Sequence, residues 1–239
     1  GTESVPAVTK IFGPGNRFVT EAKRQVAQDI DGAAMDMPAG PSEVMVIADE
    51  TARPDFVAAD LLSQAEHGPD SQVVLVTPSD ALARAVAAAI EQLLPTLSRA
   101  DVAETALKHA RALVVPDLSM ALAVANRYAP EHLILAGDQA DSWATQIETA
   151  GSVFVGHLTP EALGDYISGT NHVLPTGGWA RVYAGLSVSD FMRRMTLQRA
   201  TAEGIQRLGP PAIRLANHEG LGAHALAIDL RLQAVKGER

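Results

Sequence analysis

The chain has 239 residues, which is enough for one or two domains with a sizeable hydrophobic core. Its formal net charge of −9 argues against a nucleic-acid partner or an anionic membrane surface. No apolar run has the length of a membrane-spanning helix, and no signal-peptide pattern is present at the start. The chain has no cysteine, which excludes disulfides and thiolate metal ligands and fits a reducing compartment. We therefore expect a cytoplasmic globular protein whose metal ligands are imidazole, carboxylate and amide groups.

The N-terminal part contains a glycine loop, Gly13–Asn16, followed by a helical pattern from Thr20 to Ile30. Thr20 is a suitable N-cap for that helix. The loop resembles a phosphate-binding loop in outline, but it lacks the GxGxxG spacing and does not by itself predict a nucleotide site.

Short apolar runs and longer helical patterns alternate through most of the chain. The runs predict strands at Ala33–Met35, Val44–Ala48, Val73–Thr77, Ala112–Val115, Leu133–Leu135 and Val153–Val155. The helical patterns cover Pro54–His67, Ser79–Leu94, Asp101–Ala110, Ser119–Tyr128 and Gln139–Ala150. Strands that alternate with helices of this length predict βαβ units and a mostly parallel sheet. The strands lack strict polar alternation, as expected when helices cover both faces of the sheet.

The alternation stops after Val155. Residues 156–186 show no clear periodicity, but their aromatic and aliphatic content predicts an ordered, functional loop. Helical patterns follow at Asp190–Arg199, Ala202–Asn217 and Glu219–Val235, and Gly209–Pro211 is expected to interrupt the second of them.

The helix ending before Gly68–Pro69 carries Gln64 and His67 three residues apart. This spacing puts an amide oxygen and an imidazole nitrogen on one face of the last turn, where both could approach a cation. The alternative is a polar helix end that faces solvent.

Glu131 and His132 stand in the turn between Pro130 and the strand that begins near Leu133. In a regular strand they would face opposite ways, so only an irregular turn lets both reach one site. There they could act as a pair of proton acceptors. The alternative is one exposed acid and one packed histidine.

Four further residues are candidates in the C-terminal part. Asp165 and His172 lie in the long loop and are possible ligands or substrate contacts, although Asp165 could equally cap a turn. Glu219 and His224 are expected on the final helix, five residues apart. Five residues turn through roughly 500°, so these two side chains could flank one ligand but not chelate one ion together.

Seven motifs together resemble the histidinol dehydrogenase family, in the family's order and along the whole chain. They are Lys10–Asn16, Asp36–Glu43, Leu62–Gly68, Pro130–Leu133, Gly164–Tyr166, Asn171–Thr176 and Glu219–His224. Several are long and unusual in composition, so the resemblance is specific.

The resemblance implies an NAD-dependent, zinc-containing enzyme that oxidises L-histidinol to L-histidine through an aldehyde. It implies proton acceptors at Glu131 and His132, and a contact between Asn16 and NAD. It also implies that the zinc ligands are Gln64, His67, Asp165 and His224, and that Ser42, His172 and Glu219 contact the substrate together with His132 and the metal ligands. A homodimer with shared active sites is implied as well, in which the C-terminal arm reaches the partner's site.

The family's chains are substantially longer than this one. The resemblance therefore predicts incomplete Rossmann-like parallel sheets with a C-terminal helical arm. The expected parts are a remnant of the NAD-binding domain (1–42), an incomplete substrate and metal domain (43–186) and a helical dimerisation arm (187–239).

Two alternatives remain. One is a related zinc and NAD alcohol dehydrogenase for another small primary alcohol such as a sulfonated diol, although Glu219 and His172 suit the amine and imidazole of histidinol. The other is an inactive remnant that fails to bind NAD. A geometric question also stays open, because ligands of parallel sheets bind beyond the carboxyl ends of the strands, whereas His67 and Glu131–His132 precede theirs. Either the long loop folds back, or one strand runs against the others.

Overall fold

The computed structural model describes residues 1–237, and the chain forms two compact units, Gly1–Phe191 and Met192 to the C-terminus. None of the helices within residues 1–237 has the length and apolar character that crossing a bilayer requires. Each unit is described by itself below.

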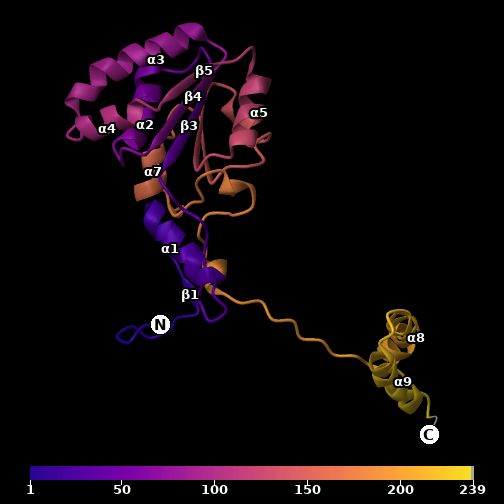
Figure 1. Ribbon diagram of the computed structural model, residues 1–239. Coiled ribbons are helices and arrows are strands. Elements are labelled where there is room, and N and C mark those ends of the chain that lie inside the picture. The colour runs from indigo at the N-terminus through magenta and orange to yellow at the C-terminus, as the bar shows by residue number, and fades with distance from the viewer. Residues whose placement is uncertain (238–239) are drawn as a thin grey trace. The chain divides into compact units, whose positions relative to one another are not determined.

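A five-stranded parallel sheet is the centre of the first unit (Figure 1). Its strands are β3 (Glu43–Ala48), β4 (Gln72–Thr77), β5 (Arg111–Val114), β6 (His132–Ala136) and β7 (Ser152–Val155), in the order β5-β4-β3-β6-β7. All neighbouring strands are parallel, and Val44 pairs with Val73 on one side and with His132 on the other. The predicted parallel α/β sheet is therefore confirmed.

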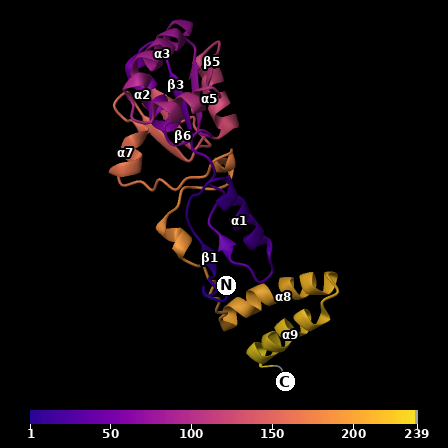
Figure 2. The same ribbon diagram turned by 60° about the vertical axis from the view of Figure 1, so that its left-hand side comes forward.

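Helices cover both faces of this sheet, as Figures 1 and 2 show. One face packs against α2 (Pro54–Ala65), α3 (Asp80–Leu93) and α4 (Ala100–Leu107), and a 3-10 turn, η1 (Leu94–Thr96), joins the last two. The other face packs against α5 (Leu118–Tyr128) and α6 (Ala140–Ala144). Because strand side chains alternate, Val44 and Val46 enter the first layer of core, whereas Met45 and Ile47 enter the second. Burial on both faces explains why these strands are apolar throughout.

A smaller element lies at the N-terminal end of the first unit. Strands β1 (Lys10–Ile11) and β2 (Ala34–Met35) pair in parallel, and α1 (Arg17–Gln28) connects them. The N-cap of α1 is Asn16, whose Oδ1 accepts hydrogen bonds from Phe18 and Val19. Thr20 was the wrong cap, since its hydroxyl donates to the carbonyl of Ala39 at 2.6 Å.

The segment after β7 contains a helix that the sequence did not indicate. This helix, α7 (Glu161–Tyr166), is followed by two 3-10 turns, η2 (Trp179–Arg181) and η3 (Val188–Phe191). It is only 6 residues long and so has too few turns for a visible hydrophobic period.

The second unit is a pair of packed helices, α8 (Ala202–His218) and α9 (Gly222–Lys236). The predicted helix Asp190–Arg199 is wrong, since only the turn η3 forms there. The interruption at Gly209–Pro211 is also wrong, because α8 includes both prolines. Their missing N–H groups release the carbonyls of Gln206 and Arg207, which are exposed residues whose carbonyls water can satisfy.

Glu219 and His224 do not share a helix. Glu219 ends α8, Gly220 turns the chain with φ of +74°, and His224 lies in the first turn of α9. The rotation argument made for one continuous helix therefore does not apply to them.

Candidate metal and base site

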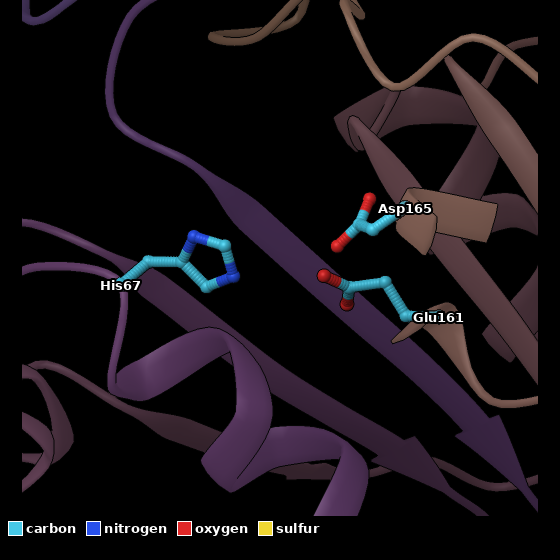
Figure 3. A group of neighbouring side chains, drawn as sticks. All are labelled: His67, Glu161 and Asp165. Carbon is cyan, nitrogen blue, oxygen red and sulfur yellow. The ribbon is translucent and has the colours of Figure 1, made fainter. Parts of the chain in front are cut away.

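His67, Glu161 and Asp165 form a cluster of possible metal ligands. One ligand atom from each lies within 4.8 Å of the other two. His67 follows the end of α2, whereas both carboxylates stand on α7, and Figure 3 shows the imidazole facing them across the gap. Imidazole and carboxylate groups that converge in this way suit a divalent cation such as zinc.

Unpaired polar atoms near this cluster strengthen the case for a cation. Gln64 is fully buried one turn before His67, and neither of its side-chain polar atoms has a hydrogen-bond partner among the described residues. Glu161 is 1% exposed, and its Oε2 is likewise unpaired within residues 1–237. Buried polar atoms are costly when unpaired, so the residues present fit a site completed by a cation.

Burial and neighbouring charges shift the pKa of Glu161. Burial raises this pKa to about 8; the charge of His132 opposes this rise, whereas the charges of Asp165, Glu131 and Asp60 add to it. Burial also raises the pKa of Asp60, on α2, to about 7. A bound cation would favour the ionised form of both carboxyl groups.

The imidazole of His132 has a defined orientation at the first position of β6. Its Nδ1 lies 3.0 Å from the carbonyl oxygen of Glu43, which can only accept, so Nδ1 carries a proton. Its Nε2 lies 3.9 Å from Asp165 Oδ1. The nitrogen that can accept a proton therefore faces the ligand cluster.

Glu131 lies against the same imidazole. Its Oε2 accepts a hydrogen bond from the Glu43 backbone N–H at 2.8 Å and stands 3.5 Å from His132 Nδ1. Burial lowers the pKa of His132, but the hydrogen bond to Glu131 and the charges of Glu161 and Glu131 outweigh it and raise that pKa to about 9. Glu131, at the end of the turn before β6, and His132, at the start of β6, thus lie side by side at one site.

The site lies at the amino-terminal edge of the sheet, because Glu43 and His132 begin their strands. All five strands are parallel, so none runs against the others. Instead, the chain after β7 folds back and brings α7 beside His132, where Glu161 Oε1 lies 3.8 Å from Nδ1.

A cavity of about 410 Å³ adjoins the cluster and brings Asn16, Ser42 and His67 together. Its volume is within the roughly 300–1,000 Å³ typical of small-molecule sites. A larger cavity of about 670 Å³ shares Pro41 and Asp70 with it but is lined by none of the clustered ligands. The candidate site is therefore identified by its clustered ligand groups and not by the volume of its cavity.

Not every predicted residue is placed at this site. His172 is exposed on the loop after α7, and no hydrogen bond or ion pair within residues 1–237 joins it to the cluster. Glu219 and His224 belong to the second unit, so their roles stay predictions. Glu161 and Asp60 were missed. Asp60 could have been found from its spacing. It stands four residues before Gln64 and seven before His67, so a helix places all three on one face.

Fold and site together define a parallel α/β protein with a candidate metal site beside Glu131 and His132. Residues 1–232 match the sequence model of the family described as histidinol dehydrogenase. The chain is 60% identical to a histidinol dehydrogenase of Xanthomonas axonopodis pv. citri, with 97% of this chain and 54% of the relative covered. The corresponding enzyme of Pectobacterium atrosepticum is 57% identical, with 99% and 53% covered.

A crystal structure of histidinol dehydrogenase from Elizabethkingia anophelis superposes with a TM-score of 0.94 at 49% identity, over 99% of this chain and 54% of that one. This chain belongs to the histidinol dehydrogenase family. It spans about half the length of the curated relatives that it matches.

Proposed function

We propose that the complete protein oxidises L-histidinol to L-histidine in two NAD-dependent steps at a zinc-containing site in the cytoplasm. The alcohol loses a hydride and a proton to give L-histidinal. The aldehyde then adds water, and its hydrate loses a second hydride and proton to give the carboxylic acid. Two NAD molecules are reduced for each histidinol.

The orientation of His132 is the observation that carries this proposal. Its Nδ1 faces a carbonyl, so its Nε2 is the acceptor and lies next to the His67–Glu161–Asp165 cluster. A substrate held by the cluster would present its hydroxyl group to that nitrogen. The choice of histidinol as the substrate rests on the family to which the chain belongs.

The two bases have different tasks in this scheme. His132 takes the proton of the alcohol as the first hydride leaves, and it serves again in the second oxidation. Glu131 takes a proton from the water that adds to the aldehyde. Its hydrogen bond from the Glu43 N–H keeps one carboxylate oxygen oriented while the group acts as a base.

The proposed metal ligands combine the cluster with the resemblance. Gln64, His67 and Asp165 would hold zinc, with His224 as the fourth ligand from the resemblance and Glu161 as an additional nearby carboxylate. When bound, zinc supplies a positive charge that positions the substrate, and NAD supplies the hydride acceptor.

Ser42 and His172 would contact the substrate, and Asn16 would contact NAD. Residues 1–42 and 43–186 would be the cofactor and substrate parts. The arm, 187–239, would bring Glu219 and His224 to the site of a second copy in a homodimer.

The test uses the complete protein purified without chelator. We expect stoichiometric zinc by elemental analysis, and NADH formation from L-histidinol that a chelator abolishes and added zinc restores. The variant His67→Ala should lose both the bound zinc and the formation of NADH. The matched control is His157→Ala, because His157 pairs with Asp138 away from the cluster and should keep both. A protein with no bound metal, or one that oxidises a sulfonated diol but not histidinol, contradicts the proposal.

A further inference from the structure

Lys23 and Asp36 form a buried ion pair outside the metal and base site. Their side chains are 7% and 0% exposed, and the Lys23 ammonium contacts Asp36 Oδ1 directly. Asp36 also accepts the N–H of Met37 at 2.7 Å. Burial would raise the pKa of Asp36, but the hydrogen bonds from Lys23, Gly13 and Met37 hold it below its usual range. A buried charge pair is costly unless it is well hydrogen-bonded, and here the N–H groups of Gly13 and Met37 and the carbonyl of Gly13 complete it.

The pair holds the glycine loop through hydrogen bonds to both the N–H and the carbonyl of Gly13. Gly13 donates its N–H to Asp36 Oδ2 at 2.8 Å, and its carbonyl accepts a hydrogen bond from Lys23 Nζ at 2.7 Å. Gly13 has φ of +126°, a conformation that side-chain-bearing residues rarely adopt. The pair therefore fixes the direction in which the chain enters Pro14–Asn16.

The same pair holds a second segment. Asp36 directly follows β2, and Lys23 Nζ also lies 3.4 Å from the carbonyl of Met37. From Met37 the chain continues to Ser42, and Thr20 adds a hydrogen bond to Ala39 along the way. Lys23 and Asp36 thus join the glycine loop to the segment that leads to Ser42.

Both of these segments line the cavity that also reaches His67. Pro14–Arg17 form one wall and Gly40–Ser42 another. The Oδ1 of Asn16 is occupied in capping α1, so the group it offers a ligand is its amide N–H₂ donor. A donor held at a fixed position suits a ribose hydroxyl or a phosphate of a dinucleotide.

We propose that the Lys23–Asp36 pair is a positioning device for the dinucleotide, because it fixes two walls of the cavity that Asn16 and Ser42 line. Neither residue contacts the ligand in this role. The inference rests on the proposed function, since it takes NAD as the occupant of that cavity.

The test measures NAD binding by calorimetric titration of the complete zinc-loaded protein. Lys23→Met and Asp36→Asn each leave a buried partner unpaired and could unfold the protein. The double variant K23M/D36N removes both charges, and replacing a buried pair as a whole is often tolerated. The matched control is the double variant E21Q/R24M on the same helix, because Glu21 and Arg24 form an exposed ion pair.

We expect NAD to bind K23M/D36N about 10- to 100-fold more weakly, since each hydrogen bond to the ligand that is lost when the walls move weakens binding by up to about tenfold. Zinc content should stay at the unmutated level, because His67 and Asp165 stand on other elements. The control should change NAD affinity less than about twofold.

The possible results separate the two proposals. If the unmutated protein binds no NAD, the proposed function fails and the inference fails with it. If the unmutated protein and K23M/D36N bind NAD equally, the inference alone fails. Loss of zinc together with NAD, or an unfolded double variant, would make the pair a general structural element and would also overturn the inference.

Discussion

Asp60→Asn should stabilise the metal-free protein, and more so at higher pH. Burial raises the pKa of Asp60 from 3.8 to about 7. An acid whose pKa is raised by folding opposes folding once it ionises, so the stability of the native protein falls as pH rises between those two values. Three pKa units correspond to about 4 kcal/mol as an upper limit. Because Asp60 is only partly buried, we expect a gain of about 1–3 kcal/mol at pH 8 for the variant, and a smaller gain at pH 5.

The assay is denaturant unfolding of the complete protein with chelator present. Trp143 is 2% exposed in the core of the first unit, so its fluorescence reports that unit. Asp55→Asn is the matched control on the same helix. Asp55 is exposed, and its hydrogen bond with Arg53 lowers its pKa, so its removal should not stabilise the protein. The reasoning is refuted if Asp60→Asn does not raise the free energy of unfolding, or raises it equally at pH 5 and pH 8.

The same substitution should weaken metal binding. The charge of Asp60 lies close enough to Glu161 to raise the pKa of that residue. A cation at the cluster would be attracted by both carboxylates. Zinc titration of Asp60→Asn should therefore give a lower affinity than the unmutated protein, although the metal-free fold is more stable. Unchanged zinc affinity would show that the Asp60 carboxylate does not interact electrostatically with the bound metal.

Three further predictions concern the complete protein. Glu131→Gln should slow oxidation of the aldehyde by roughly 10²–10⁴-fold with a much smaller effect on the first hydride transfer, whereas His132→Asn should slow both steps. Single-turnover NADH formation from histidinol, compared with turnover from histidinal, separates these rates, and equal slowing of both steps by Glu131→Gln would contradict the assignment. Gly151→Ala should reduce activity and the melting temperature, since its Cβ would lie 2.5 Å from the Glu131 carbonyl oxygen; unchanged values for both would show that the backbone shifts freely. Glu161→Gln should lower zinc affinity by roughly 10–100-fold in a titration, and an unchanged affinity would exclude its carboxylate from the metal's surroundings.

The sheet could be predicted from the sequence because its signals are local. Each buried strand is a short apolar run between turn residues, and the helices around it have clear periodicity. Helix α7 could not be predicted in this way, since it has 6 residues and its start signals are limited to Pro160 and the acidic Glu161 in the first turn. The error at Asp190–Arg199 has a related cause. Spacing typical of a helix was present, but a helical pattern alone does not stabilise a short helix.

The candidate site was predicted only in part. Gln64, His67, Glu131 and His132 stand in motifs whose residue types indicate chemistry. Glu161 stands outside any motif that drew attention, and it joins the site only because the chain after β7 folds back. The sequence left that return as one of two alternatives and did not decide between them. The return depends on contacts between α2 and α7, whose residues are about 100 positions apart in the chain.

Main-chain groups of Glu43 orient the side chains of Glu131 and His132. The parallel register sets Val44 beside His132, so the residue before Val44 faces the turn that holds Glu131. Glu43 then donates its N–H to Glu131 and its carbonyl accepts from His132, and both groups are present with any residue but proline at position 43. The Glu43 carboxylate has a different partner, the N–H of Gly177 in the long loop, at 2.8 Å. A substitution of Glu43 that keeps the strand in place should therefore loosen that loop and leave the pairing of the bases intact. The orientation of Glu131 and His132 is in this sense a property of the sheet edge, whereas the Glu43 side chain acts on the long loop.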